Sequence, residues 1–287
     1  MNESNRWRRA DPPERPVLFV NPASGGGRAR RTGLVDRAGE RGIAVRVFGP
    51  ADDLAALAAD EVARGADALG VAGGDGSLAT VAAIAYAHGL PFVCIPAGTR
   101  NHFALDVGVD RRDVVGALDA FADGVDRRID VAEVNGRVFL NNVSLGIYGD
   151  AVRQPTYRDA KARTLLETAA QTLGPSAAAP DLQLVDDRGR MLRHAAVVLV
   201  SNNPYSLEPP RAPGTRPALD SGRLGIIVLD TPRPRQSPGR SWTATRVEVT
   251  APAPVHAGVD GEAVELVPPL RFAIRPRALR VRIAHAA

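Results

Sequence analysis

The chain has 287 residues, 45% of them hydrophobic and 24% charged, which is the composition of a soluble globular protein with one large or two moderate domains. No segment offers the roughly 18 uninterrupted apolar residues of a membrane span, and the Arg-rich start lacks a signal peptide's apolar core, so a cytoplasmic location is expected. Lys161 is the only lysine, which excludes P-loop proteins and protein kinases, because both need a lysine.

The net charge and the single cysteine limit the chemistry further. A formal net charge of +4 and a pI of about 9.8 favour an anionic partner. This excess of basic residues is too small to decide among nucleic acid, acidic lipid and phosphorylated ligands. Cys94 excludes internal disulfides. It stands in an apolar run, so a buried, inert thiol is expected.

The first half of the chain alternates short apolar runs with helical patterns. Strands are expected at Pro16–Val20, Ala44–Phe48, Ala68–Ala72 and Pro91–Ile95. Helices are expected at Arg28–Arg41, from a cap at Asp52 or Asp53 to Gly65, at Leu78–Tyr86 and at Asp110–Phe121. This alternation predicts a doubly wound parallel sheet, which binds ligands at the carboxyl ends of its strands. Three polar loops, at Asn21, Gly73 and Gly98, leave those ends and are expected to lie close together.

The pattern changes near Gly124–Arg128, after which strands dominate. Asn135-Gly136, between Ile129–Val134 and Val138–Val143, predicts a two-residue hairpin. Further strands are expected at Leu182–Val185, Ala195–Val200, Leu224–Leu229, Arg246–Thr250, Leu270–Ile274 and Leu279–Ile283, and one helix at about Ala160–Leu173. The sequence therefore predicts an α/β plus β fold: an α/β domain of residues 1–126, then an antiparallel, sandwich-like β domain of residues 127–287.

The stretch Gly73–Ser77 joins an expected strand to an expected helix through a glycine-rich loop that holds one acid. Glycines let a backbone approach a phosphate, and the N–H groups at a helix N-terminus are free donors, so an anion site is one interpretation. Asp75 would repel a bare phosphate, which favours a metal ion or an arginine between the two. The alternative is an ordinary tight turn in which Asp75 caps the helix.

Four motifs occur in order along the chain: Asn21-Pro22-Ala23-Ser24-Gly25, Gly73-Gly74-Asp75-Gly76-Ser77, Pro96-Ala97-Gly98-Thr99-Arg100-Asn101 and Asp260-Gly261-Glu262. Together they resemble the motif set of the diacylglycerol kinase catalytic-domain family, which includes bacterial lipid kinases and sphingosine and ceramide kinases. The resemblance extends over nearly the whole chain and includes Asn141–Gly146 and Leu219–Gly222. It implies a nucleotide-binding α/β domain followed by a β-sandwich-like domain, with the active site between them.

The resemblance also implies a reaction: ATP-dependent, Mg²⁺-requiring phosphorylation of a hydroxyl of diacylglycerol or a related lipid, as in phospholipid biosynthesis. The implied nucleotide-binding residues are Asn21, Ser24, Gly25, Gly73, Gly74, Gly76, Ser77, Thr99 and Asn101. Asp75 would organise magnesium, and Asp220 lies where some bacterial members hold a structural metal. Asp75, Asp260 and Glu262 would act at the chemical step, and a carboxylate such as Glu262 could accept the proton of the acceptor hydroxyl.

The sequence departs from the family pattern after the third motif. Asn101 is usually followed by aspartate, but His102 stands here, which affects the expected metal arrangement. Ser77 replaces the commoner threonine and keeps its hydroxyl. The partners implied are ATP and a lipid at a membrane surface, reached by peripheral association; no nucleic acid is expected, and a homodimer is allowed.

Three alternatives remain open. A kinase of a soluble substrate, resembling the NAD kinases or 6-phosphofructokinases, would share the Gly-Gly-Asp-Gly loop. A non-catalytic nucleotide-binding or lipid-sensing protein would explain His102 as a mark of lost activity. A dinucleotide-binding fold fits poorly, because the glycine loop follows the third strand and no acid stands about 20 residues onward to hold a ribose.

Overall fold

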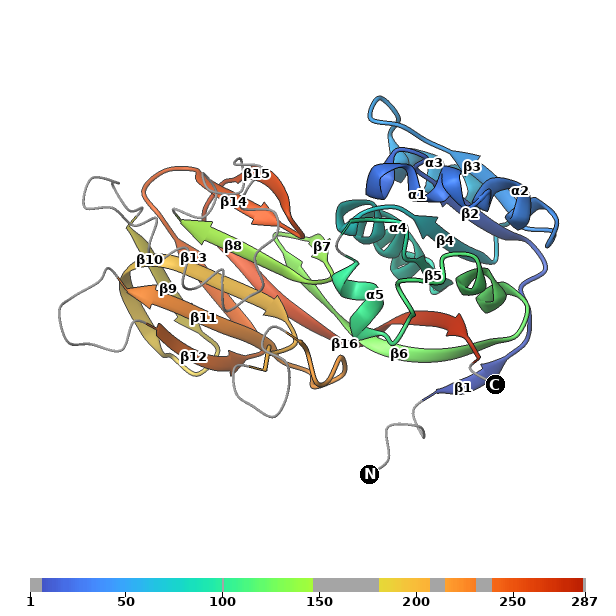
Figure 1. Ribbon diagram of the computed structural model, residues 1–287. Coiled ribbons are helices and arrows are strands. Elements are labelled where there is room, and N and C mark those ends of the chain that lie inside the picture. Colours follow the sequence, from blue (N-terminus) through green and yellow to red (C-terminus); the bar gives the residue numbers. More distant parts are fainter. Residues whose placement is uncertain (1–6, 100, 147–180, 207–214, 231–238, 286–287) are drawn as a thin grey trace. The chain divides into compact units, whose positions relative to one another are not determined.

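The computed structural model describes residues 7–99, 101–146, 181–206, 215–230 and 239–285 (Figure 1). The chain divides into two compact units: unit 1 is Met1–Ile129 with Arg277–Ala287, and unit 2 is Asp130–Pro276. The predicted second domain ran to residue 287, whereas Arg277–Ala287 here belongs with unit 1. The helix expected at Ala160–Leu173 lies outside the described residues. Within the described ranges, no helix is long and apolar enough to span a membrane.

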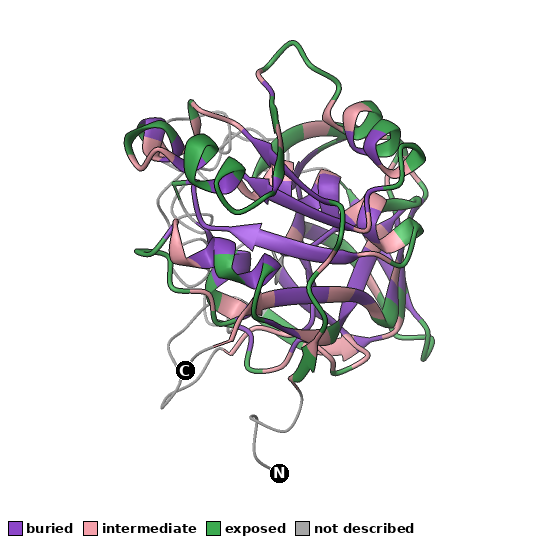
Figure 2. Ribbon diagram, turned by 90° about the vertical axis from the view of Figure 1, so that its right-hand side faces the viewer, coloured by how far each residue is buried: buried purple, intermediate pink, exposed green. Residues whose placement is uncertain are grey.

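Unit 1 is built on a parallel sheet in the order β5-β4-β2-β3. Its strands are β2 (Pro16–Val20), β3 (Ala44–Val47), β4 (Ala68–Ala72) and β5 (Pro91–Ile95). Every residue of β2, β4 and β5 is buried, as Figure 2 shows in purple at the centre of this unit. Such strands are continuous apolar runs because both faces of a parallel sheet are covered. The predicted parallel sheet is confirmed.

Five helices accompany this sheet: α1 (Ser24–Arg31), α2 (Leu34–Gly39), α3 (Leu54–Ala63), α4 (Asp75–Ala87) and α5 (His102–Asp106). The single helix predicted at Arg28–Arg41 is wrong, because Gly33 adopts a φ of 61° and separates α1 from α2. The predicted cap of α3 is confirmed, since the Asp53 carboxylate accepts a hydrogen bond from Ala56 N at 3.0 Å.

The helix predicted at Asp110–Phe121 is wrong over its first half. Only a 3₁₀ helix, η2 (Gly116–Phe121), forms there. Asp110 accepts from Arg112 N (2.8 Å) and Asp113 from Gly116 N (2.7 Å), so two side chains take backbone donors at the points where turns form instead of a regular helix. The apolar residues of η2 still pack into the core of unit 1, together with Leu34 and Val93.

Unit 2 is an antiparallel β structure whose strands order as β15-β14-β8-β10-β9-β13-β16, with β11 on β10, β12 on β11 and β7 on β6. Its strands are β6 (Gly124–Val134), β7 (Arg137–Phe139), β8 (Asn142–Gly146), β9 (Leu182–Asp186), β10 (Met191–Asn202), β11 (Leu224–Asp230), β12 (Gly239–Ala244), β13 (Arg246–Thr250), β14 (Val255–Val259), β15 (Glu262–Leu266) and β16 (Leu270–Ala284). The predicted hairpin is confirmed: Asn135 and Gly136 have φ of 49° and 82°, and Val134 pairs with Arg137.

Strands β6 and β16 run beyond unit 2. Residues Arg280–Arg282 of β16 pair in parallel with β5, while its earlier residues pair with β13 in unit 2. In unit 1, β1 (Arg8–Ala10) pairs with the start of β6. The two strands predicted at Leu270–Ile274 and Leu279–Ile283 are thus one strand of 15 residues.

The stability of unit 1 is expected to depend on pH through Glu61 of α3. Burial would raise the pKa of Glu61, but hydrogen bonds from Arg46 (2.8 Å) and Arg64 (2.6 Å) outweigh it and hold the pKa below its ordinary value of 4.5. A carboxylate whose folded pKa is lowered stabilises the fold above its unfolded pKa and loses that contribution as pH falls through the folded value. The side chains of Arg46 and Arg64 are 43% and 62% exposed, so solvent screens both pairs and the contribution is about 1 kcal/mol or less. We expect it to be lost as the pH falls below 4.5.

Urea unfolding between pH 7 and pH 3 tests this expectation. Glu61→Gln should flatten the acidic part of the curve, while Asp60→Asn is the matched control, since Asp60 is 65% exposed and 4.0 Å from Arg64. Identical pH dependence in wild type and Glu61→Gln contradicts the assignment.

Candidate functional site

In unit 1, three loops leave the carboxyl ends of adjacent strands. The loop Asn21–Gly27 follows β2; it includes the first residues of α1, because Gly25, Gly26 and Gly27 do not have helical dihedral angles. Gly73-Gly74 follows β4, and Pro96–Asn101 follows β5. Asn21 N donates to Ala72 O at 3.0 Å, which ties the first loop to the strand that leads into the second. The order of the strands therefore brings the first three motifs to one edge of the sheet.

The glycines of these loops sit where the backbones touch. A Cβ added to Gly25 would lie 2.2 Å from Ala97 O, and one added to Gly98 would lie 2.7 Å from Gly73 O. No real Cβ approaches backbone atoms so closely, so only glycine fits at these two positions. The expectation that the three loops lie close together is confirmed, and their packing explains the glycines at positions 25 and 98.

The first loop has an unusual backbone. Gly25, Gly26 and Gly27 follow one another with φ of 57°, 67° and 83°. This is a left-handed turn, which costs other residues free energy at each position. The side chain of Asn21 closes the loop from within, since its Oδ1 accepts from Ala23 N at 3.0 Å. Asn21 thus shapes the loop in addition to its predicted contact with a ligand.

Asp75 is the first residue of α4, directly after Gly74. The N-terminus of this 13-residue helix carries N–H donors and the positive end of the helix dipole, so anions are favoured beside it. The Asp75 charge also acts on the thiol of Cys94 in β5: burial, and secondly the Asp75 carboxylate, raises the pKa of Cys94. Cys94 is 1% exposed, which confirms the prediction of a buried, inert thiol.

Asn101 is the buried polar residue of the third loop, with only 2% of it exposed. Its Nδ2 donates to Pro96 O (3.2 Å) and Gly98 O (2.8 Å), so one half of the amide holds the loop. Its Oδ1 is buried and accepts no hydrogen bond from the described residues. A buried acceptor of this kind is costly unless a ligand supplies its partner. Thr99, in contrast, is exposed, and so is His102.

The last motif lies in unit 2, at the hairpin turn between β14 and β15. Asp260 and Gly261 have φ of 48° and 87°, and Val259 pairs with Glu262, so this is a two-residue hairpin. The two acids differ sharply. Asp260 is 7% exposed, whereas the side chain of Glu262 is 54% exposed and pairs with Arg137 at 3.3 Å.

The Asp260 carboxylate is bound to the backbone of a neighbouring segment, Leu140–Asn142. One oxygen accepts from Leu140 N at 2.8 Å, and the other accepts from Asn141 N at 2.8 Å and Asn142 N at 3.1 Å. Asn142 O in turn accepts from Asp260 N at 3.0 Å. The hairpin turn and the segment are therefore linked by four hydrogen bonds.

Arg216 is a buried residue that the sequence analysis did not single out. It lies within the Pro- and Arg-rich stretch Pro204–Pro217, whose composition is typical of a loop, yet it is only 4% exposed. Its guanidinium donates to Leu140 O, to Asn202 O (2.9 Å) and to Asn141 Oδ1 (2.9 Å). No periodicity or motif marks this arginine, because its partners Leu140 and Asn141 are 76 and 75 residues away in the chain.

Among the described residues, no group of three His, Cys, Asp or Glu side chains that could hold a metal ion includes Asp220. Its neighbours are held by other contacts: Ser221 N donates to Asn203 Oδ1 (2.9 Å) and Gly222 N to Asp130 Oδ2 (2.7 Å). Across the described part of the chain, no three His, Cys, Asp or Glu side chains gather closely enough to hold a metal ion by themselves. A metal ion bound by the described residues would therefore need further ligands.

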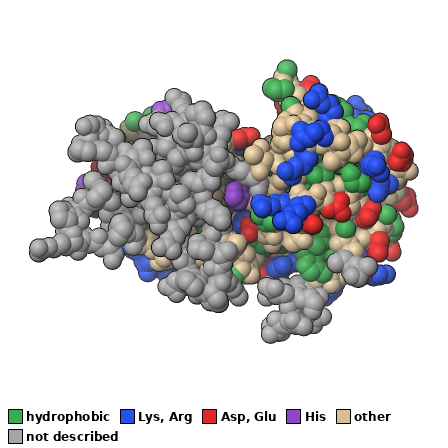
Figure 3. Space-filling model, in the orientation of Figure 1, with side chains coloured by type: hydrophobic (Ala, Val, Ile, Leu, Met, Phe, Trp, Pro, Cys, Tyr) green, Lys and Arg blue, Asp and Glu red, His purple; other side chains and the backbone are tan. Residues whose placement is uncertain are grey.

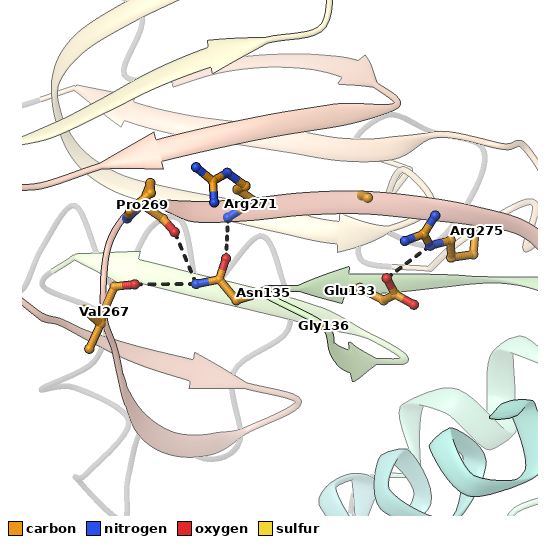
Figure 4. Close-up of a pocket in the computed structure, with 8 residues that line it drawn as sticks. Glu133, Asn135, Gly136, Val267, Pro269, Arg271 and Arg275 are labelled. Atoms are coloured by element: carbon orange, nitrogen blue, oxygen red, sulfur yellow. Dashed lines mark hydrogen bonds and ion pairs between the residues drawn. The ribbon is translucent and has the colours of Figure 1, made fainter.

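Unit 2 also has a pocket of about 590 Å³ beside the hairpin of β6 and β7, which contains none of the predicted site residues (Figure 4). Its polar groups bind one another. Asn135 Nδ2 donates to Pro269 O (3.2 Å), Asn135 Oδ1 accepts from Arg271 N (2.8 Å), and Arg275 pairs with Glu133 at 3.1 Å. Side chains already paired in this way do not favour a polar ligand.

Charged side chains of both signs lie on the described part of one face of the molecule (Figure 3). On the face that Figure 3 shows, basic and acidic side chains are interspersed over the described surface. A mixed surface is typical of a soluble protein and gives no strong field of one sign. The loops of unit 1 and the acid turn of unit 2 thus remain the candidate site residues.

Comparisons with known proteins agree with these features. The family model of the diacylglycerol kinase catalytic domain matches residues 15–134, which include the first three motifs. A Pseudomonas aeruginosa protein named as a YegS-like lipid kinase is 30% identical over 295 residues, 93% of this chain and 94% of that protein. A diacylglycerol kinase of Mycobacterium tuberculosis is 36% identical over 122 residues, and the match spans 41% of this chain but only 40% of that protein.

A solved structure shares the fold. The crystal structure of a diacylglycerol kinase from Bacillus anthracis str. Sterne superposes with a TM-score of 0.67 at 18% identity, and the match covers 95% of this chain and 97% of that chain. At this identity the similarity concerns the fold alone. It confirms the predicted α/β plus β fold class.

Proposed function

Because the chain belongs to the family of the diacylglycerol kinase catalytic domain, we propose that it transfers the γ-phosphate of ATP to a hydroxyl of diacylglycerol or a related lipid. The observation that carries this proposal is the meeting of three glycine loops at one edge of the unit 1 sheet, with Gly25 against Ala97 and Gly98 against Gly73. Such an edge offers closely spaced backbone N–H groups to phosphates.

Unit 1 is proposed to hold the nucleotide through its backbone. The loops contribute Asn21, Ser24, Gly25, Gly73, Gly74, Gly76, Ser77, Thr99 and Asn101, and the N-terminus of α4 adds its dipole. The buried Oδ1 of Asn101 needs a donor or a cation, and a nucleotide bound with its metal ion can satisfy it. Phosphoryl transfer depends mainly on alignment and on neutralising charge, for which this backbone-rich site is suited.

Magnesium is proposed to bind with the nucleotide, near Asp75. Mg²⁺ prefers oxygen ligands and is often held by one or two carboxylates together with substrate phosphates, so a cluster of three protein acids is not required. When bound, it neutralises the developing charge of the transferred phosphoryl group. Asp75 and the Asn101 amide oxygen are its proposed oxygen ligands in unit 1.

Glu262 is proposed to accept the proton of the lipid hydroxyl. Of the two acids in its turn, Glu262 is the exposed one, and a proton acceptor must be within reach of the substrate. Arg137 lies 3.3 Å from Glu262 and pairs with its carboxylate. The lipid acceptor further implies that the protein works at a membrane surface.

The direct test is phosphate transfer from ATP by the purified protein to lipids of a total lipid extract, with the products identified by mass spectrometry. A lipid that gains one phosphate only when Mg²⁺ is present supports the proposal. Phosphorylation of NAD or a sugar phosphate without lipid turnover would overturn it in favour of a kinase of soluble substrates. Calorimetric binding of ATP without transfer to any acceptor would indicate a non-catalytic protein.

A further inference from the structure

We propose that Asp260 is a positioning residue, which acts together with Arg216 to fix the segment Leu140–Asn142 and the acid turn bound to it. The proposal rests on the proposed function, in which Glu262 of the same turn accepts the proton. It assigns different work to the two acids of the Asp260-Gly261-Glu262 motif. All of the residues concerned lie in unit 2.

The carboxylate oxygens of Asp260 are bound to the backbone of this segment. Both accept backbone hydrogen bonds, at 2.8, 2.8 and 3.1 Å, from three consecutive residues of the segment. Hydrogen bonds to a charged carboxylate are stronger than neutral ones, and three such bonds hold it in one orientation. Because Asp260 is only 7% exposed and three of the roughly four acceptor positions of its carboxylate are taken, little of it is open to a substrate hydroxyl.

Arg216 binds oxygen atoms of the same segment. Arg216 donates to Leu140 O and to Asn141 Oδ1 (2.9 Å), while Asp260 accepts from the N–H groups of these two residues. Asn202 Nδ2 also donates to Leu140 O at 3.2 Å. The buried carboxylate of Asp260 thus binds the N–H groups of this short segment, and the buried guanidinium of Arg216 binds its oxygen atoms.

The segment is connected to Glu262 through the backbone of the acid turn. Asp260 N donates to Asn142 O at 3.0 Å, and Val259 pairs with Val143 in the adjacent strand β8. Glu262 follows two residues after Asp260 and pairs with Val259 across the turn. Fixing the segment therefore fixes the backbone from which the Glu262 side chain extends.

The test compares Asp260→Asn, Glu262→Gln and the control Asp187→Asn by hydrogen exchange and by the pH profile of kcat. In Asp260→Asn, an amide group would face backbone N–H donors, so amides 140–142 should exchange roughly tenfold faster or more. The kcat of Asp260→Asn should fall at all pH values, while the decline of kcat towards acidic pH (the acidic limb of the profile) remains. Glu262→Gln should lose that limb and keep the slow exchange. Asp187 accepts from Thr245 N at 3.0 Å, so Asp187→Asn removes a similar bond elsewhere in unit 2 and should leave both readouts unchanged.

The opposite pattern overturns the proposal. If Asp260 is itself the proton acceptor, Asp260→Asn will abolish the acidic limb and leave the exchange of amides 140–142 slow. Should Asp260→Asn fail to fold, Arg216→Lys reads the same segment from its other side, because lysine lacks the guanidinium fork. If amides 140–142 exchange at the wild-type rate in Arg216→Lys, the proposal that Arg216 and Asp260 together fix this segment is wrong. Hydrogen exchange needs no substrate, so failure of the kinase assay would leave this part of the result standing.

Discussion

Replacing Asp75 with asparagine is expected to lower the rate of phosphate transfer to lipid by about 100-fold or more, the loss typical for removing a group that stabilises transition-state charge. Asparagine has nearly the shape of aspartate, so the loops of unit 1 should keep their packing. The charge beside the N-terminus of α4 is removed, and with it the proposed carboxylate ligand of Mg²⁺. Initial rates with saturating ATP at several Mg²⁺ concentrations measure the effect.

Asp53→Asn is the matched control for this variant. Asp53 also stands at a helix N-terminus of unit 1, where it caps α3 at 3.0 Å from Ala56 N, and asparagine is an equally good cap. Its turnover should equal that of the wild type. Undiminished turnover in Asp75→Asn, under conditions where the wild type is active, would remove Asp75 from the site.

Replacing Gly25 with alanine is expected to destabilise unit 1 by roughly 2–4 kcal/mol and to abolish measurable ATP binding. The added Cβ would lie 2.2 Å from Ala97 O, so the first and third loops must separate. The φ of 57° adds the cost of a left-handed residue that is not glycine. Urea unfolding measures the stability, and calorimetry with ATP measures the binding.

Gly26→Ala separates the two causes. Gly26 has a similar φ of 67°, but nothing lies within 4 Å of its Cβ position. This variant should therefore lose only about 1 kcal/mol, the conformational cost alone. Equal losses in the two variants would show that contact between the loops contributes nothing, which would contradict the proposed role of their packing.

The strands of unit 1 could be predicted closely from the sequence. β2, β4 and β5 begin and end at the predicted residues, because each is an uninterrupted apolar run that stops at a loop of Gly, Asn or Pro. The errors lie in the helices, where single residues changed the outcome. Gly33 divides one predicted helix, and side-chain hydrogen bonds of Asp110 and Asp113 replace the start of another.

Unit 2 was harder to predict because its strands alternate and pair over long distances. β12, β14 and β15 were not predicted. β12 and β15 contain several polar residues and little apolar alternation, whereas β14 is buried at four of its five residues but is a short run interrupted by His256. β16 looked like two strands because Arg275, Pro276 and Arg277 interrupt its apolar pattern. A proline within a strand usually argues against continuation, but here the strand passes through it.

For the candidate site, motif order located the loops of unit 1 correctly in space, since parallel strands must end at one edge. What the sequence could not provide is which polar residues are buried. Asp260 and Arg216 look like solvated turn and loop residues, yet they are 7% and 4% exposed. Asp260 is 120 residues and Arg216 is 76 residues from Leu140 in the chain, so no local pattern reveals these contacts.

The long strand β16 has a consequence for how the chain folds during synthesis. Its residues Arg280–Arg282 complete the unit 1 sheet beside β5, but they follow the whole of unit 2 in the chain. A nascent chain therefore exposes one edge of β5 from the time residue 95 leaves the ribosome until the last residues of β16 appear. An open, apolar strand edge invites pairing with other chains, so the period of translation is when this protein is most prone to aggregate.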